Sequence, residues 1–312
     1  MVNDTHDERV RRMHLSLDGL SVGDAFGQRF FSPNEFVTEE RIRRNEAPAG
    51  RWNYTDDTEM ALAIVEVLQT HGRIDQDVLA TTFARRYVNE PLRGYGPMAR
   101  RILETIAVGH PWREVSTAVF GGQGSHGNGG AMRAPPLGAF FADDLALAAT
   151  EAALSAEVTH AHPDGQAGAI AAAVAAGFAW QHRGEKGAEV TTRFFDVVLE
   201  HTPASDTRDG IATAASLPLS EDVETAVSGL GNGSRVISAD TVPFSLWCAA
   251  RHWGDYTGGL WAAVSAGGDR DTTSAIIGGI LALSAGDGAI PDRWLRAREA
   301  LHRASRHETH RE

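Results

Sequence analysis

Apolar residues recur every three or four positions along most of this chain, whereas strict alternation of apolar and polar residues is almost absent. The first pattern is typical of amphipathic helices and the second of strands. The spacing predicts helices over roughly residues 9–26, 58–70, 76–86, 96–108, 146–158, 165–182, 189–201, 242–252, 257–266 and 272–285. We therefore expect an all-α fold, a compact orthogonal bundle of helices.

Small residues gather in helices that should pack closely. Gly19, Gly23 and Gly27 repeat every four residues in the first helix, residues 165–182 are rich in alanine, and two adjacent glycines occupy 278–279. Small side chains let two helix backbones approach each other. A glycine inside a helix costs about 1 kcal/mol relative to alanine, so these glycines predict tight helix crossings.

Composition and charge limit the kind of protein. Hydrophobic residues make up 42% of the chain and charged residues 22%, which is ordinary for a globular protein, and no linker divides the sequence. We expect one domain over residues 1–312, with polar ends at about 1–8 and 296–312, the second a solvated, frayed tail. The formal net charge of -12 disfavours nucleic acid and anionic membranes, because phosphate binding needs a concentrated basic face.

The termini and the cysteine content bear on cellular location. The N-terminal residues are too polar for a signal peptide, and no stretch approaches the roughly 18 apolar residues of a membrane helix. The single cysteine, Cys248, lies in an apolar run and rules out an internal disulfide. We expect a cytoplasmic protein with a buried Cys248. The oligomeric state stays open.

Two short acidic strings, at residues 54–58 and 267–273, each run directly into an apolar helical pattern. Asp and Thr are favoured at helix starts, because their oxygens accept unpaired backbone N–H groups and the carboxylate suits the helix dipole. Capping needs only one such residue per helix, whereas several oxygen donors crowd these two starts. The alternative to capping is that four carboxylates converge: Asp56, Asp57, Asp269 and Asp271.

Converging carboxylates would raise one another's pKa values unless cations neutralised them. Oxygen donors without cysteine, and without paired histidines at zinc spacing, favour Mg²⁺ or Mn²⁺ over Zn²⁺. The number of donors suggests two divalent cations. Two such ions about 3.5–4 Å apart can share a bridging carboxylate, activate water and hold neighbouring substrate oxygens.

A cluster of glycines at residues 121–130 precedes the segment Ala131-Met132-Arg133. Its GxGxxG match over 122–127 is weak evidence for a dinucleotide-binding fold, because prolines follow and no strand alternates with helices around it. A nest of backbone N–H groups for phosphate is the better interpretation, with Asn128 and Arg133 as additional donors. A flexible surface turn remains the alternative.

Two histidines and one aspartate lie in or next to predicted helices. His160 and His162 stand just before the alanine-rich helix, where one of them caps the helix or contacts substrate, and neither is expected to be a catalyst. Asp24 lies among the glycines of the first helix. We expect Asp24 to be a buried structural acceptor rather than a ligand.

Four motifs in this order resemble the ADP-ribosylglycohydrolases, the group that contains the dinitrogenase reductase-activating glycohydrolases. They are GDAFG at 23–27, TDDT at 55–58, GNGGAMR at 127–133 and GDRDT at 268–272, with a weaker fifth at Thr159-His160. Together they span nearly the whole chain. Their joint occurrence is far more specific than any one of them.

The resemblance implies an all-α fold with a binuclear Mg²⁺ or Mn²⁺ centre that hydrolyses the bond between an ADP-ribosyl group and its acceptor. The implied partner is an ADP-ribosylated protein or another ADP-ribose conjugate. A carboxylate of Asp56 or Asp57 would activate water against an oxocarbenium-like centre. The implied metal ligands are Thr55, Asp56, Asp57, Asp269, Asp271 and Thr272. The candidate substrate contacts are Gly127, Asn128, Gly129, Gly130, Met132, Arg133, Phe31 and His160.

One position departs from the family pattern. Many members carry a glutamate four residues after the GDAFG motif, and this chain has Phe31 there. Glu35 would substitute only if its loop folds back, and Phe31 would instead stack against adenine or ribose. The departure keeps a second hypothesis open, a non-hydrolytic ADP-ribose or nucleotide-binding protein. A third, a purely structural role like that of related lens crystallins, is disfavoured by the intact acidic motifs.

Overall fold

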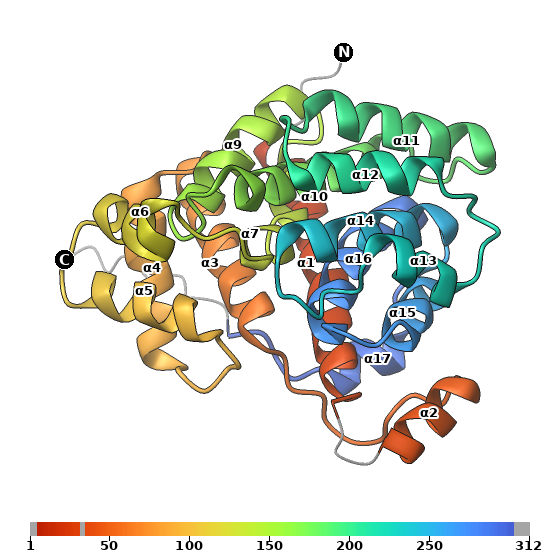
Figure 1. Cartoon of the computed structure of the whole chain (residues 1–312). Coiled ribbons are helices and arrows are strands. Elements are labelled where there is room, and N and C mark those ends of the chain that lie inside the picture. The colour runs from red at the N-terminus through yellow and green to blue at the C-terminus, as the bar shows by residue number, and fades with distance from the viewer. Residues whose placement is uncertain (1–4, 32–34, 303–312) are drawn as a thin grey trace.

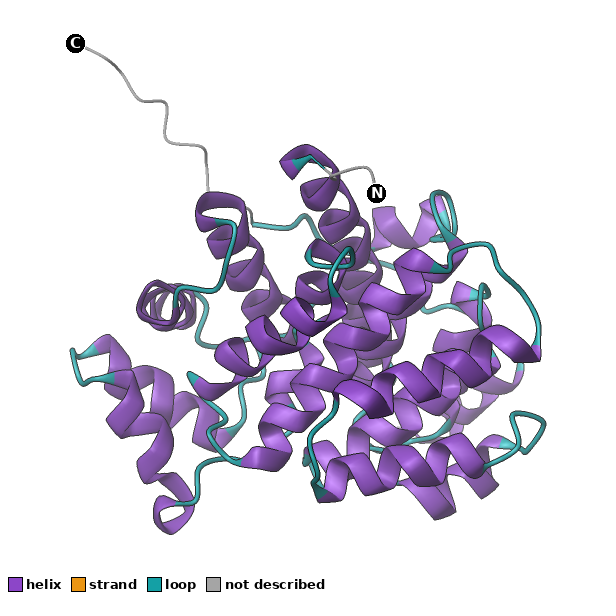
Figure 2. Ribbon diagram, turned by 90° about the horizontal axis from the view of Figure 1, so that it is seen from above, coloured by secondary structure: helices purple, strands orange, loops and turns teal. Residues whose placement is uncertain are grey.

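A computed structural model describes residues 5–31 and 35–302 of the chain. Helices account for the regular structure of this part, and the two remaining backbone pairings are isolated bridges (Figures 1 and 2). The all-α prediction is confirmed. The helices are α1 (His6–Gln28), α2 (Glu35–Arg43), α3 (Asp56–His71), α4 (Gln76–Asn89), α5 (Pro97–Ala107), α6 (Trp112–Gly122), α7 (Gly129–Met132), α8 (Pro135–Phe140), α9 (Leu145–Glu157), α10 (Pro163–Gln181), α11 (Ala188–His201), α12 (Asp206–Ser216), α13 (Val223–Leu230), α14 (Ser238–Arg251), α15 (Tyr256–Ser265), α16 (Arg270–Ala285) and α17 (Asp292–Ala297).

Every helix predicted from apolar spacing is present, and several further helices, of 4 to 11 residues, were not predicted. The additional ones are α2, α6, α7, α8, α12, α13 and α17. Helix α8 begins at Pro135, so the prolines that we expected to stop a long helix start a short one. The first N–H groups of a helix have no acceptor within it, and the missing N–H of proline therefore costs nothing there. The shortest of them, such as α7 and α8, present too few turns for a clear apolar period, whereas α6 and α12 are as long as the predicted α5.

Helices α1 and α16 form the most extensive helix pair of the described structure. The predicted glycine ridge lies in this contact: a Cβ added to Gly23 would lie 2.1 Å from the carbonyl oxygen of Ser274, and one added to Gly27 would lie 2.3 Å from that of Arg270. The hydroxyl of Ser16 adds a hydrogen bond of 2.9 Å to the carbonyl of Gly279. The C-terminal half of α1 therefore lies directly against the start of α16.

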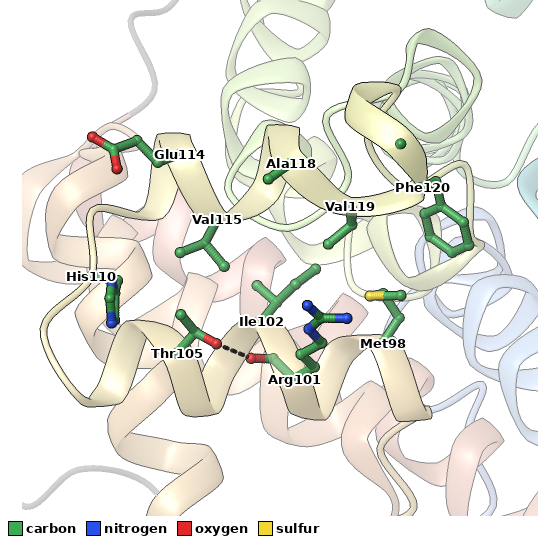
Figure 3. A pocket seen from close by; sticks show the side chains of 11 residues that line it. Met98, Arg101, Ile102, Thr105, His110, Glu114, Val115, Ala118, Val119 and Phe120 are labelled. Carbon is green, nitrogen blue, oxygen red and sulfur yellow. Dashed lines mark hydrogen bonds between the residues drawn. The ribbon is translucent and has the colours of Figure 1, made fainter.

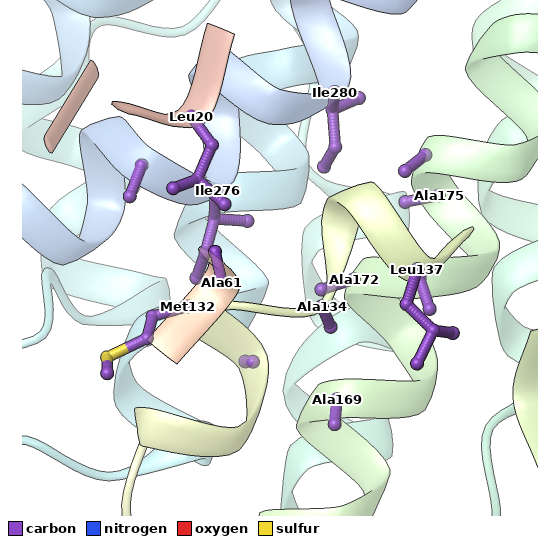
Figure 4. Close-up of a cluster of buried hydrophobic side chains, with 14 of the residues drawn as sticks. Leu20, Ala61, Met132, Ala134, Leu137, Ala169, Ala172, Ala175, Ile276 and Ile280 are labelled. Carbon is purple, nitrogen blue, oxygen red and sulfur yellow. The ribbon is translucent and has the colours of Figure 1, made fainter. Parts of the chain in front are cut away.

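The alanine-rich helix α10 is buried along nearly its whole length. Its alanines, Ala172 among them, lie beside Ala134 and Leu137 (Figure 4). Cys248 is fully buried, as expected. Each helix within residues 5–31 and 35–302 is too short or too polar to cross a bilayer.

The expectation of a frayed tail from residue 296 is wrong for residues 296–302. Helix α17 continues to Ala297, and the Glu299 N–H donates to the Trp52 carbonyl at 2.9 Å. Glu299 is buried and pairs with arginines from distant segments. Charged residues suggested solvent exposure, but their partners lie elsewhere in the chain. Residues 1–4 and 303–312 of the predicted polar ends lie outside the described structure, and α1 already begins at His6, capped by Thr5.

Candidate active site

Asp24 of α1 fixes the start of α3. Its carboxylate accepts the backbone N–H of Thr55 at 2.9 Å and that of Thr58 at 3.2 Å. It also accepts the hydroxyls of these two threonines, at 2.8 and 2.5 Å. Thr55 is the N-cap of α3, and its hydroxyl oxygen lies 2.9 Å from an oxygen of Asp57. Asp24 is thus the buried acceptor that we expected.

The two acidic strings meet where α1 packs against both α3 and α16. One carboxylate oxygen from each of Asp24, Asp57 and Asp271 lie within 4.8 Å of one another, close enough to hold a metal ion. Asp56 and Asp269 line the same cavity as Asp57 and Asp271. The convergence of the four carboxylates is therefore present in the structure, and Asp24 extends the cluster by a residue that we had considered only structural.

Burial and mutual repulsion make this cluster costly without a counter-ion. Burial, followed by the charge of Asp24, raises the pKa of Asp56 to about 7. Burial and the neighbouring carboxylates also raise the pKa values of Asp57 and Asp271 well above the ordinary range. One carboxylate oxygen of Asp57 is buried and accepts no hydrogen bond within the described structure. An oxygen-only cluster with an unpaired buried acceptor fits a hard divalent cation.

These carboxylates line a cavity of about 540 Å³. Its walls come from the starts of α3, α5 and α16, from the glycine segment before α7, and from residues 235–237. The predicted site residues among its lining are Asp56, Asp57, Gly127, Asn128, Gly129, Met132, His160, Asp269, Asp271 and Thr272. The structure thus brings most of the predicted residues together around one cavity.

The glycine segment is held by pairing with residues 236–238. The Asn128 N–H donates to the Val236 carbonyl at 3.3 Å, and the Ser238 N–H donates to the His126 carbonyl at 3.1 Å. The side-chain amide of Asn128 donates to Asp269 at 2.7 Å, which couples this segment to the acidic cluster. The segment is therefore a supported wall of the cavity rather than a free surface turn.

His160 packs closely against the glycine segment. A Cβ added to Gly129 would lie 2.8 Å from the His160 ring, so the approach requires glycine. Burial, with the charge of Arg133 as the next cause, lowers the pKa of His160 to about 3. His160 is therefore neutral at neutral pH. His162 is the residue that caps α10, accepting the Asp164 N–H at 3.1 Å.

The prediction that Arg133 contacts the substrate is wrong, because Arg133 does not line the cavity. Its guanidinium is fully enclosed, donates to the Ser155 carbonyl at 3.0 Å and the Thr159 hydroxyl at 2.9 Å, and stacks over the Phe83 ring. Burial lowers its pKa to about 9. Gly127 and Gly129 line the cavity, whereas Arg133 at the end of α7 does not. Arg133 therefore stabilises the wall of the cavity from the protein interior.

Two further predicted contacts lie outside the cavity lining. A Cβ on Gly130 would lie 3.1 Å from the Gly165 carbonyl oxygen, so Gly130 packs against α10. Phe31 is 48% exposed and does not line the cavity. It precedes residues 32–34, which are not described, and the side chain of Glu35 is not described either. We therefore remove Gly130 and Phe31 from the substrate contacts.

Sequence reasoning missed several lining residues, among them Phe120 and Arg235. Phe120 has a φ of 54°, is exposed, and lies with its ring 5.8 Å from that of His126. Such a φ is an outlier for a bulky residue and is often found where function demands it. Arg235 is the sole lysine or arginine of the lining, and no described residue forms an ion pair with it. Only the neighbouring glycines signalled that these residues lie in special turns.

A second cavity of about 460 Å³ lies between α5 and α6 and shares Met98 and Phe120 with the first. Ile102 and Val115 form part of its apolar lining, and Arg101 extends between the two helices (Figure 3). Phe120 therefore stands at the junction of two cavities.

Known proteins resemble this chain in sequence and in fold. Human ADP-ribosylhydrolase ARH3 is 30% identical over 284 residues, covering 79% of this chain and 74% of that protein. An uncharacterized protein of Archaeoglobus fulgidus is 30% identical over 305 residues, covering 93% and 91%. ADP-ribosylarginine hydrolase Tri1 of Pseudomonas putida is 29% identical over 174 residues, covering 50% and 43%.

A solved structure of an ADP-ribosylglycohydrolase-related protein complex matches with a TM-score of 0.66 and 25% identity over 94% of each chain. The model of the family described as ADP-ribosylglycohydrolase matches residues 4–311. That range contains both acidic strings, the glycine segment and the α1–α16 pair that brings them together. The chain therefore belongs to the ADP-ribosylglycohydrolase family.

Proposed function

We propose that this chain is a metal-dependent hydrolase that cleaves the glycosidic bond between ADP-ribose and an acceptor, on a protein side chain or a small molecule. The observation that carries the proposal is the buried carboxylate cluster, with its unpaired Asp57 oxygen, in the same cavity as the glycine segment. The bond cleaved would be N- or O-glycosidic. Two of the relatives above are named as an ADP-ribosylhydrolase and an ADP-ribosylarginine hydrolase.

Two Mg²⁺ or Mn²⁺ ions would be held by six residues, and the donor set fits such ions because it contains only oxygen. Bound ions would supply positive charge that polarises ribose hydroxyls and a water molecule. Asp24 holds Thr55 and Thr58 in place, and one of its carboxylate oxygens also lies within 4.8 Å of oxygens of Asp57 and Asp271. The proposed ligands are Thr55, Asp56, Asp57, Asp269, Asp271 and Thr272.

The chain's own carboxylates would carry the proton of the attacking water. Asp56 or Asp57 accepts this proton as the water oxygen bonds to the ribose C1 and the acceptor leaves. Both belong to the first turn of α3, so their backbone positions are fixed by the contacts of Thr55. The leaving acceptor takes up a proton from water, since Phe31 stands where many family members carry a glutamate.

The rest of the cavity suits the diphosphate and adenosine of ADP-ribose. Gly127 and Gly129 line the cavity with backbone alone, and the neutral His160 packs against them. Arg235, rather than Arg133, supplies the positive charge for a diphosphate. The exposed ring of Phe120 offers a flat apolar surface for the adenine base.

The test is release of ADP-ribose from arginine, serine and small-molecule conjugates by the purified protein, with Mg²⁺ and Mn²⁺ supplied in turn. We expect release with at least one metal and conjugate, and loss of release in Asp271→Asn, whose helical circular dichroism should match the wild type. Wild-type protein that releases nothing across the panel would contradict hydrolysis.

Phe31 favours a second candidate function, a non-hydrolytic ADP-ribose or nucleotide-binding protein. Calorimetry that detects tight ADP-ribose binding, together with no turnover of any conjugate, would select this candidate. The single domain over residues 1–312 and the cytoplasmic location remain predictions beside both candidates.

A further inference from the structure

The segment that follows α17 runs past the start of α3 toward α4 (Figure 1). We call residues 298–302 the C-terminal strap. The strap pairs in parallel with the loop that leads into α3, through a bridge between Arg298 and Trp52. The Arg298 guanidinium also donates to Asp18 of α1 at 3.1 Å. The strap is therefore anchored to the body of the protein on both sides of the α3 start.

Glu299 is the buried centre of this contact. Its carboxylate accepts the backbone N–H of Tyr54 at 3.0 Å, the guanidinium of Arg51 at 2.8 Å, and the guanidinium of Arg93. Burial opposes ionisation of Glu299, but the hydrogen bond and the charge of Arg93 outweigh burial and lower its pKa. Arg93 also lies over the Tyr54 ring, 4.2 Å from its centroid. Glu299 is therefore an ionised carboxylate with three donors.

Three successive backbone N–H groups lead into α3, and each has an acceptor from a different part of the chain. The acceptors come from the strap, from α1 and from the loop after α4. The bonds are Tyr54 N–H to Glu299 at 3.0 Å, Thr55 N–H to Asp24 at 2.9 Å, and Asp56 N–H to the Arg93 carbonyl at 2.8 Å. Glu299 supplies the first bond directly and steadies the third, because it also binds the Arg93 side chain.

A second path joins the strap to the first turn of α3. The Tyr54 hydroxyl donates to Glu59 at 3.0 Å, and Arg86 pairs with the other oxygen of Glu59 at 2.8 Å. Arg86 also donates to the strap, at the carbonyl of His302, at 3.1 Å. Tyr54, Glu59 and Arg86 are buried. The strap therefore closes a network around the turn that carries Asp56 and Asp57.

We propose that Glu299 is a positioning residue for the carboxylate cluster, acting through Tyr54 and Arg93 on the backbone of Asp56 and Asp57. The proposal rests on the proposed function in one respect, the metal that these carboxylates would bind. Partners behind the direct ligands orient them, and their loss typically weakens metal binding by about 10–100-fold. A segment at the far end of the chain would thus set the metal affinity of a site near residue 56.

The experiment compares Glu299→Gln and Glu299→Ala with the wild type in the full chain. Amide hydrogen exchange of residues 52–57 is measured in the metal-free protein, and Mn²⁺ affinity is measured by electron paramagnetic resonance. Glu185→Gln is the matched control, because Glu185 also accepts a guanidinium, that of Arg193, but does so at the exposed surface. Exchange in α10 reports whether a variant is loosened globally.

We expect faster exchange confined to residues 52–57 and Mn²⁺ binding weakened by about 10–100-fold, more in Glu299→Ala than in Glu299→Gln. The control should behave as the wild type. Unchanged exchange at 52–57, or unchanged Mn²⁺ affinity despite faster exchange, would overturn the positioning role. If the wild type binds no Mn²⁺, the metal part of the proposed function fails, while faster exchange confined to 52–57 would still support the strap's hold on the α3 start.

Discussion

Arg133 and Arg235 show how far two arginines of one chain can differ in role. Arg133 lies in a recognisable motif and is fully buried, with one guanidinium nitrogen bound to Ser155 and Thr159. Arg235 lies outside every motif, is exposed, and lines the cavity. Residue type and motif membership did not distinguish a structural guanidinium from one available to a ligand. The tertiary structure distinguishes them, because it encloses Arg133 and exposes Arg235 at the cavity.

Substitution of Arg235 tests this distinction. We expect Arg235→Ala to weaken ADP-ribose binding by about 10–100-fold, because a hydrogen bond to a charged group contributes about 1.5–3 kcal/mol. Adenosine binding should change little, since adenosine has no phosphate. Calorimetry with both ligands measures the difference.

The control for this experiment is Arg133→Lys. It should lower the melting temperature, because a buried guanidinium loses its partners, while ADP-ribose affinity in the folded protein changes less than in Arg235→Ala. An equal loss of affinity for ADP-ribose and adenosine in Arg235→Ala would contradict a phosphate contact.

The buried His160 should make the stability of the protein depend on pH. Its pKa is lowered to about 3, against about 6.5 in an unfolded chain. The unfolded state therefore binds more protons below pH 6.5, and the unfolding free energy falls as pH drops from there toward 3. The expected loss at pH 5 is about 2 kcal/mol from this residue.

The measurement is urea unfolding of wild type and His160→Gln between pH 8 and pH 5. The variant should lose less stability over this interval than the wild type, whatever its stability at pH 8. Identical pH dependence in the two proteins would show that His160 is not held neutral.

At the scale of helices, the contact between α1 and α16 determines whether the site exists. Thr55 caps α3 and is bound to Asp24 of α1, while Gly27 of α1 lies against the start of α16. The helix starts converge because a glycine ridge allows the closest approach. Apolar spacing predicted both long helices, but it contains no information on which helices cross.

Alanine at Gly23 should disturb this crossing. Its Cβ would lie 2.1 Å from the Ser274 carbonyl oxygen, where only backbone movement can relieve the overlap. We expect Gly23→Ala to lower the unfolding free energy by about 1–3 kcal/mol or more. Because α1 carries Asp24, Mn²⁺ affinity should fall as well.

Gly229→Ala is the matched control, because Gly229 lies in α13 with no heavy atom within 4 Å of an added Cβ. Alanine there should stabilise the protein by about 0.5–1 kcal/mol through the unfolded chain. Chemical unfolding of the two variants should therefore give changes of opposite sign. The same sign in both would contradict the close crossing.

At the scale of the whole molecule, the carboxylate cluster links metal binding to stability. Burial and repulsion raise the pKa values of Asp57 and Asp271, so the metal-free fold contains unfavourable charge. We expect Mn²⁺ to raise the unfolding free energy, by about 2.7 kcal/mol at a free concentration one hundred times the dissociation constant. Urea unfolding in chelator and in Mn²⁺ measures this increment.

Asp57→Asn should relieve the repulsion in the metal-free fold and remove most of the stabilisation by Mn²⁺. Removing one of the repelling charges makes the metal-free variant at least as stable as the metal-free wild type, while the increment from Mn²⁺ largely disappears. An undiminished increment would place the metal elsewhere. The amide has the shape of the carboxylate and its NH2 group can donate to the Thr55 hydroxyl oxygen, so the start of α3 should remain intact.

The sequence by itself determined the helical class, the long helices and the residues at their starts, because apolar spacing and capping are local properties of the chain. It also indicated the carboxylates and the glycine segment, since their composition is unusual at those positions. The tertiary structure alone decided which side chains face the cavity: it enclosed Arg133, left Phe31 outside, and brought in Phe120 and Arg235. It also turned an apparent solvated tail into the strap around Glu299. These outcomes depend on contacts between segments far apart in the chain, and such contacts are fixed by packing and burial rather than by local pattern.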